Sequence, residues 1–172
     1  MLSISGRRIG VAFLVLVALP ATVRAQIYNT TSAMPVRIEL IAACTVSADD
    51  LDFGAYASNS TTPVQGQTTI HLLCGAGSTA ELFLDAGSGP GGGSGSTSNR
   101  RLEQDAGKGT LGYDLFQDPG RTVHWGDRSG RDTLEIETTG AQQTIPIYGQ
   151  IPAGQRALDG TYSDTITVTI LY

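Results

Sequence analysis

Two histidines, His71 and His124, are the residues on which Ser-His-Asp catalysis in this chain would depend. No G-x-S-x-G segment, which exposes the nucleophilic serine of many hydrolases, occurs in the sequence. His71 alternates with apolar residues as in a strand, and His124 precedes Trp125 at an expected hairpin end. The pattern therefore predicts two structural histidines and no catalytic residue.

Pairs of carboxylates could instead supply the acid and the base of glycoside hydrolysis. The sequence offers Asp114 with Asp118, and Asp127 with Asp132. These acids flank turns that contain glycine or proline, where aspartate is a common surface residue that bonds to its own backbone. No pair is singled out as acid and base, so we expect a protein that is not an enzyme.

A glycine- and serine-rich segment covers residues 86–99. Glycines can let backbone N–H groups approach a phosphate, but no G-K-[ST] follows and no helix is expected to begin there. We predict a solvent-exposed loop and no bound cofactor.

The first 25 residues have the features of a secretory signal peptide. Arg7 and Arg8 precede an apolar stretch at 11–19, and Val23, Arg24 and Ala25 form a small-x-small cleavage signal. The apolar stretch is shorter than the roughly 18 to 20 residues that a membrane span needs. We therefore expect export and a mature chain that begins at Gln26.

Removal of this peptide makes the chain more acidic. Three of the 11 Lys and Arg leave with it and no acid does, so 8 basic residues face 16 acidic ones and the formal charge is −8. Nucleic-acid binding needs a basic stripe, which is absent, so that class of function is excluded. Of 172 residues, 147 remain, which is enough for one domain with its own core.

Cys44 and Cys74 are the only cysteines. With the two histidines they could supply four zinc ligands, but their spacing matches no finger pattern, and we predict no metal site. In an exported protein two cysteines most simply form a disulfide. We expect a Cys44–Cys74 bond that stabilises the fold by about 3 to 4 kcal/mol.

Short β-rich segments separated by turn residues run through the mature chain, and no long segment has apolar residues at helical spacing. Their number and spacing suit a sandwich of the immunoglobulin kind. Pro146 lies inside one segment and cannot donate to a ladder, which predicts an edge strand or a bulge there. The expected strands are residues 34–41, 44–46, 51–56, 68–74, 80–85, 111–117, 144–151 and 161–171.

Both ends of the mature chain alternate between apolar and polar residues. Near the start, Arg37 and Glu39 separate the apolar residues Met34, Val36, Ile38 and Leu40. At the end, threonines separate Ile166, Val168, Ile170 and Tyr172. These ends suit strand exchange between molecules, and the alternative is that 34–41 is an ordinary first strand of its own domain.

Several segments, in the same order, resemble the Spore Coat Protein U domain family, which includes the pilins of archaic chaperone-usher pili of the Csu type. The final segment contains the fairly specific pattern G-x-Y-x-D-x-x-x-V. The resemblance covers nearly all of the mature chain, and the loops at 57–62 and 86–99 depart from it most. The segments are C-T-V at 44–46, L-D-F-G-A-Y at 51–56, L-G-Y-D-L-F at 111–116, R-T-V-H-W-G-D at 121–127, I-P-I-Y-G-Q-I-P-A-G-Q at 145–155 and G-T-Y-S-D-T-I-T-V-T-I-L-Y at 160–172.

The resemblance implies an all-β fold: an incomplete immunoglobulin-like sandwich that is completed by donor-strand exchange. It implies three parts, a signal peptide at 1–25, a donor-strand extension at 26–41 and a pilin-like domain at 42–172. The donor residues would be Met34, Val36, Ile38 and Leu40. The acceptor strand would carry Ile166, Val168, Ile170 and Tyr172.

The function implied is that of a secreted structural subunit of an archaic chaperone-usher pilus, for surface attachment and biofilm formation. Its partners would be a periplasmic chaperone, an outer-membrane usher and neighbouring pilins joined head to tail at the cell surface. One alternative is a secreted spore-coat or surface-layer protein. A less favoured one is a small exported binding or hydrolytic domain.

Overall fold

The computed structural model describes residues 31–39, 41, 43–90 and 96–172. The chain divides into two units, Met1–Ile38 and Glu39–Tyr172. The predicted signal peptide, and Leu40 among the predicted donor residues, lie outside the described residues. Within the described residues, no helix is long and apolar enough to cross a membrane.

The first unit is described from residue 31 onward, and these residues form no strand. Met34, Val36 and Ile38 are 82 %, 82 % and 91 % exposed. The strand predicted for 34–41 is therefore not present in the described residues of that range. A single extended segment has no ladder of its own, because strand hydrogen bonds need a neighbouring strand.

In the residues that the structure describes, the second unit consists of antiparallel strands and the 3₁₀ turn η2 (Thr97–Asn99). The all-β prediction is confirmed. The strands are β1 (Cys44–Ala48), β2 (Val64–Cys74), β3 (Thr79–Leu84), β4 (Arg101–Gln104), β5 (Thr110–Gly112), β6 (Asp114–Phe116), β7 (Leu134–Glu137), β8 (Gln143–Ile151), β9 (Tyr162–Ser163) and β10 (Val168–Leu171).

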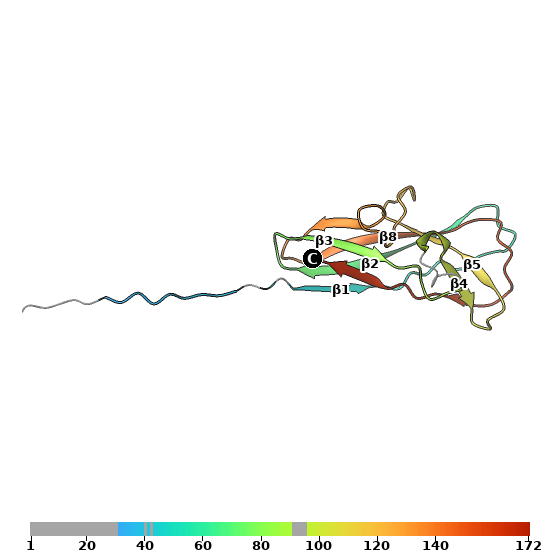
Figure 1. Cartoon of the computed structure of the whole chain (residues 1–172). Helices are drawn as coiled ribbons and strands as arrows, with labels where there is room; N and C mark the ends of the chain where they lie inside the picture. Colours follow the sequence, from blue (N-terminus) through green and yellow to red (C-terminus); the bar gives the residue numbers. More distant parts are fainter. Residues whose placement is uncertain (1–30, 40, 42, 91–95) are drawn as a thin grey trace, which may run out of the picture. The chain divides into compact units, whose positions relative to one another are not determined.

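These strands form three sheets, and the two main ones enclose the core (Figure 1). One sheet has the order β1-β2-β8-β6, the second β10-β3-β7, and a small third sheet β5-β4-β9. Alternate residues of β2, β3 and β8 are buried, as strands with one core-facing side require. Trp125 lies fully buried between the sheets and donates its indole N–H to the Leu82 carbonyl (3.2 Å).

Several predicted strands differ from the observed ones. Residues 51–56 form no strand, although Leu51 and Phe53 pack against the core. The predicted strand at 161–171 is two short strands, β9 and β10, separated at 164–167, and Tyr113 separates β5 from β6 in the predicted strand at 111–117. The sequence prediction missed β4 and β7, because R-L-E-Q and L-E-I-E are too short and too charged to show a clear alternation.

Pro146 lies in β8, which is an interior strand, so the prediction of an edge strand is wrong for β8 as a whole. The pairing of β8 with β2 runs without interruption from Val64↔Ile151 to Leu72↔Gln143, so there is no bulge either. On the other side, β6 pairs only with Tyr148–Gln150. Pro146 therefore lies where the β6 ladder has already ended, and one side of β8 needs no N–H donor there.

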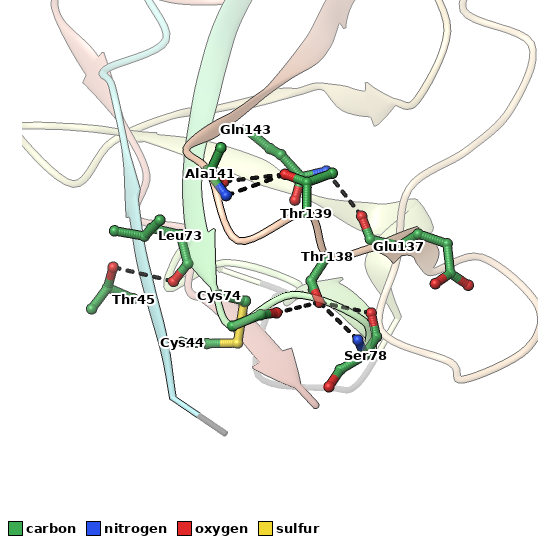
Figure 2. Close-up of a disulfide and its surroundings, with 11 residues drawn as sticks. Cys44, Thr45, Leu73, Cys74, Ser78, Glu137, Thr138, Thr139, Ala141 and Gln143 are labelled. Carbon is green, nitrogen blue, oxygen red and sulfur yellow. Dashed lines mark hydrogen bonds between the residues drawn. A yellow bond between two sulfur atoms is a disulfide. The ribbon is translucent and has the colours of Figure 1, made fainter. Parts of the chain in front are cut away.

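The Cys44–Cys74 disulfide is confirmed, and it joins directly opposed residues of β1 and β2 (Cα–Cα 4.1 Å; Figure 2). Thr138 holds the adjacent turn, since its hydroxyl donates to the Gly75 carbonyl (2.6 Å) and accepts from the Ser78 N–H (3.0 Å). The disulfide therefore fixes the first residue of an edge strand to the interior of its sheet.

Arg100 is a charged residue buried in the core, with 1 % of its surface exposed. Its guanidinium donates to the carbonyls of Leu84 (2.8 Å) and Asp85 (2.9 Å), and its Nη1 lies 3.6 Å from Asp114 Oδ1. Burial lowers the pKa of Arg100, against the opposing effect of the surrounding negative groups. The contacts with two carbonyls at the end of β3 fix the backbone there.

His124 bridges Asp114 and Thr97: its Nδ1 lies 2.8 Å from Asp114 Oδ1 and its Nε2 3.0 Å from the Thr97 hydroxyl. The order acid, imidazole, hydroxyl is that of a catalytic triad. Thr97 is only 2 % exposed, however, so its hydroxyl is not open to solvent. No sequence pattern indicates this chain of contacts, because its members come from three separate segments.

Two of the other candidate acids, Asp118 and Asp132, stabilise their own turns. Asp118 Oδ1 accepts from the N–H groups of Thr122 (2.8 Å) and Val123 (2.7 Å), and Asp132 Oδ1 accepts from the Arg128 N–H (2.7 Å). Hydrogen bonds from Val123 and Thr122 lower the pKa of Asp118. These contacts are those of aspartates that cap turns.

The disulfide gives the first testable prediction. Thiol labelling of the denatured, non-reduced protein should modify neither cysteine. Reduction should lower the free energy of unfolding by about 3 to 4 kcal/mol, because the unfolded chain regains the freedom of the 44–74 loop. Urea unfolding with and without reductant measures this change. Two reactive thiols in correctly exported protein would contradict the prediction.

The part-buried contacts of His124 give the second prediction. His124→Ala should lower the free energy of unfolding by about 1 to 3 kcal/mol, because the Asp114 carboxylate and the Thr97 hydroxyl lose their partner. The matched control is His71→Ala: His71 pairs with the exposed Asp49 (3.0 Å), and loss of such a surface pair should cost less than about 1 kcal/mol. Equal losses of unfolding free energy in the two variants would show that the His124 bridge stabilises the fold no more than a surface pair does.

Candidate functional site

The outer edge of β1 carries backbone groups that face away from its sheet. Asp49 N–H donates to the Thr69 carbonyl (2.9 Å) and Gly75 N–H to the Ala43 carbonyl (3.2 Å). Odd-numbered residues of β1 therefore bond to β2, since hydrogen-bonded residues alternate in an antiparallel pair. The N–H and C=O groups of Cys44, Val46 and Ala48 point in the opposite direction.

The edge of β10 has the same arrangement. Asp85 N–H donates to the Thr167 carbonyl (3.2 Å), which places Thr167, Thr169 and Leu171 in the bonded positions toward β3. Leu84 stands opposite Val168 but donates its N–H away from β10, to the Gly126 carbonyl (2.9 Å). The backbone groups of Ile166, Val168 and Ile170 consequently point away from β3.

These two edges are neighbours, and β1 and β10 run in opposite directions (Figure 1). At their closest pairs the Cα atoms of the two strands lie within 8 Å. Beyond Ala48 the edges diverge, and a cavity of about 310 Å³ opens between residues 48–53 and 164–168. Its floor is mostly apolar and consists of Thr68, Leu84, Leu102, Tyr113, Leu115 and Ile147.

A second, wider cavity of about 970 Å³ continues from the first, between residues 50–59 and 157–164. The two share Leu51, Phe53 and Asp164 in their walls. We call the edges of β1 and β10 with both cavities the groove, and the wider cavity its mouth. Five aspartates and no Lys or Arg line the groove: Asp49, Asp50, Asp52, Asp159 and Asp164.

Three of the four predicted acceptor residues are half-buried against the core, and they lie along this groove. Ile166 and Val168 line the smaller cavity, and Ile170 packs on the core beside them. Tyr172 is 57 % exposed and lines neither cavity. An apolar stripe thus remains partly uncovered beside backbone groups that have no strand partner among the described residues.

Asp164 positions the chain that leads into β10, and the sequence analysis did not single it out. Its Oδ1 accepts from the N–H groups of Ser88 (2.8 Å) and Gly89 (2.9 Å), and its Oδ2 from the Tyr113 hydroxyl (2.7 Å). Burial, together with the hydrogen bond to Asp164, raises the pKa of Tyr113, so the phenol stays a donor. Asp164 is the aspartate of the G-x-Y-x-D pattern, which could have marked it in the sequence. Its hydrogen-bond partners could not be predicted, because they are distant in sequence.

Two glycines make room for the wall of the groove. Gly66 and Gly149 are paired across β2 and β8. A Cβ at Gly149 would lie 2.7 Å from Phe53 Cζ, and one at Gly66 2.8 Å from Leu51 Cδ1. Residues 51–53 can therefore lie flat on the sheet only because both positions are glycine.

The chemistry that this site offers is backbone hydrogen bonding and apolar burial along an extended line. Within the described residues, no group of three or more His, Cys, Asp and Glu side chains could hold a metal ion. The groove therefore suits an extended peptide strand, which can bond to β1, to β10 or to both.

Comparison with solved structures bears on the fold. The chain of an archaic chaperone-usher pilus complex from Acinetobacter baumannii, the CsuC–CsuE chaperone-tip adhesion subunit pre-assembly complex, is similar with a TM-score of 0.54 and 24 % identity. The match covers 77 % of this chain and 40 % of that chain, and it shows a pilin-like fold. A weaker likeness, with a TM-score of 0.38 and 17 % identity, covers 74 % of this chain and 78 % of the Hda pilus minor tip subunit HdaB of E. coli.

Sequence comparison gives the family. The chain is 34 % identical over 128 residues to Protein U of Myxococcus xanthus, which is 71 % of each chain. The sequence profile of the Spore Coat Protein U domain matches residues 30–169, which is most of the chain. This protein therefore belongs to the Spore Coat Protein U domain family.

Proposed function

We propose that this protein is an exported structural subunit of an archaic chaperone-usher pilus that polymerises by donor-strand complementation. The observation that carries the proposal is the groove, where two unpaired sheet edges lie beside an uncovered apolar stripe. The N-terminal extension of a second copy supplies a matching strand, with Met34, Val36, Ile38 and Leu40 on its apolar face. A periplasmic chaperone lends a strand before assembly, and an outer-membrane usher exports the subunit to the cell surface.

The pattern of free backbone groups suits such a strand. In an antiparallel pair, residues that exchange both hydrogen bonds stand opposite each other with their side chains on the same face. The groove-facing groups of β10 belong to Ile166, Val168 and Ile170, whose side chains point inward. A donor strand antiparallel to β10 therefore bonds to it through its own inward-facing apolar residues.

Pro35 has no N–H, so one ladder bond is missing in either direction of the donor strand. In the antiparallel arrangement Pro35 faces β1, and the ladder to β10 is complete. In the reverse direction the outward-facing residues, Pro35 among them, would face β10 and leave the gap there. We propose the first arrangement, antiparallel to β10 and parallel to β1, because it keeps unbroken the ladder beside the apolar stripe of Ile166, Val168 and Ile170.

The energy of insertion comes mainly from apolar burial. Four side chains of this size contribute roughly 6 to 12 kcal/mol gross, at about 1.5 to 3 kcal/mol each, before ordering costs are subtracted. The edges must also move apart, because a strand between two neighbours needs about 9.5 Å between them. The closest Cα atoms of β1 and β10 are within 8 Å. An inserted strand thus widens the groove as well as filling it.

Each subunit offers one strand and needs one. Such a head-to-tail contact does not close on itself, so it produces a filament. A filament on the cell surface suits the functions we propose for it, attachment and biofilm formation.

A second candidate is a secreted coat or surface-layer protein. The match to Protein U of Myxococcus xanthus and the name of the family favour it. The same strand exchange would then build a layer instead of a thin fibre. Electron microscopy of assembled material distinguishes the two.

The donor face of the extension gives the third prediction. Ile38→Asp should form a normal complex with the chaperone but should not polymerise, because an unpaired carboxylate inside an apolar groove costs several kcal/mol. Chaperone co-purification and SDS-resistant multimer ladders measure the two steps. Arg37→Asp, the same change on the outward face, is the matched control and should leave the ladders nearly unchanged. Normal ladders from Ile38→Asp would rule out donor-strand exchange through this face.

The fourth prediction uses a deletion to decide whether residues 34–41 are a donor strand or a strand of their own domain. Removal of residues 26–40 should leave a subunit that folds when a chaperone or an added peptide of residues 31–41 fills its groove, yet passes no strand to a neighbour. Co-purification and the ladder assay again give the result. If 34–41 were instead the domain's own first strand, the deletion would damage folding in the chaperone complex as well.

A further inference from the structure

We call the second unit, Glu39–Tyr172, the body of the subunit. Its exposed apolar residues gather at the two ends of the groove. Apart from the extension and Ile41, the large apolar residues exposed among the described residues are Leu73, Val123, Leu158, Leu171 and Tyr172. All except Val123 lie beside one end of the groove or the other. Single exposed apolar residues are ordinary, but their placement at these two ends needs an explanation.

The first end, which we call the disulfide end, is where β1 begins and β10 finishes (Figure 1). Leu73 lies in β2 and pairs with Thr45, next to the disulfide. Leu171 is the last residue of β10, and Tyr172 follows it at the same end of the groove. Two adjoining turns at this end, residues 75–78 and 139–142, contain no charged residue. They are held together by the contacts of Thr138 with Gly75 and Ser78. Acids of this end lie in the strands instead: Glu81 stands opposite Leu171, and Glu137 stands opposite Thr79.

The second end is the mouth of the groove. Leu158 is 56 % exposed and lines the mouth together with Ala55, Ala57 and Ala157. The Leu158 carbonyl accepts from the Tyr162 hydroxyl (2.9 Å), and the neighbouring Asp159 carbonyl accepts from the Gln104 side chain (2.8 Å). Leu158 is therefore held on an anchored turn, with its side chain toward solvent.

Donor-strand exchange brings these two ends together. Only three residues separate Leu40 from Cys44, a reach of about 13 Å in an extended chain. A donor strand antiparallel to β10 has its Leu40 end near Asp164 or Ile166 of the acceptor, next to the mouth. The disulfide end of the donor's own body must then arrive at the mouth of the acceptor.

We propose that consecutive subunits dock end on end, with Leu73, Leu171 and Tyr172 of one body against Leu158 and its neighbouring alanines in the next. The proposal rests on the proposed function, since strand exchange is what joins the two copies. The contact covers apolar residues that neither the core nor the donor strand uses. It also restrains the angle between successive bodies, whereas domains joined by a linker without such a contact move freely.

Leu73→Glu tests the contact, because Leu73 is 47 % exposed and lines neither cavity of the groove. The variant should form SDS-resistant ladders as the wild type does, because the donor strand still inserts. Electron microscopy of its fibres should show a persistence length shorter by about twofold or more, because the joint has lost its apolar contact. The matched control is Val123→Glu, an equally drastic change at a residue that is 47 % exposed and lies away from both ends. Its fibres should match the wild type.

A second variant tests the short connection. Gly-Ser-Gly-Ser inserted between Ala43 and Cys44 should also keep the ladders and should also loosen the fibre, because the bodies are no longer forced together. Fibres of both variants as stiff as the wild type would overturn the docking proposal. Loss of ladders in Leu73→Glu alone would overturn it as well, by placing Leu73 in strand insertion. Absence of ladders from the wild-type protein with its chaperone would instead contradict the proposed function.

Discussion

The unpaired backbone along β1 and β10 is the constraint on which the rest of this structure depends. Backbone N–H and C=O groups beside an apolar core are costly when they have no partner. Most sheet proteins protect such edges with charges, bulges or a covering segment. Here the two edges lie side by side over half-buried apolar residues, so one added strand satisfies both the hydrogen bonds and the uncovered core.

The polar interior holds these edges in place. Arg100 bonds to the carbonyls at the end of β3, and Asp164 ties the start of the β10 segment to the loop that follows β3. Both sets of contacts act on the same short stretch of backbone under the groove. Because satisfied buried polar groups admit few alternative arrangements, they define the position of β10 even while its outer side lacks a neighbour.

The sequence predicted the parts of the fold that depend on local alternation. The core strands β2, β3 and β8, the disulfide and the β10 segment follow from period-2 patterns and from the pairing of two cysteines. The stretch at 51–56 was predicted as a strand and is not one in the subunit alone. It forms the wall of the groove, where no neighbouring strand is present to bond with it.

The contacts that set the site could not be predicted in the same way. Asp164 meets Tyr113 across 51 positions of sequence and Ser88 across 76, and such pairs carry no local pattern. The bridge through His124 joins three segments for the same reason. Pro146 was misleading, because a sequence does not reveal that a partner strand ends two residues away from it.

The place of the disulfide has a mechanical consequence. In a fibre of the proposed kind, tension passes from an inserted extension through Ala43 into Cys44. Without a cross-link, that pull would act on the first bond of an edge strand and peel β1 from β2 one bond at a time. The sulfur bridge at Cys44 instead delivers the load directly to Cys74, at the end of the long strand β2, which is bonded on both sides. The pull is then resisted in shear by many hydrogen bonds at once, and the covalent bond lies at the point where each subunit is loaded first.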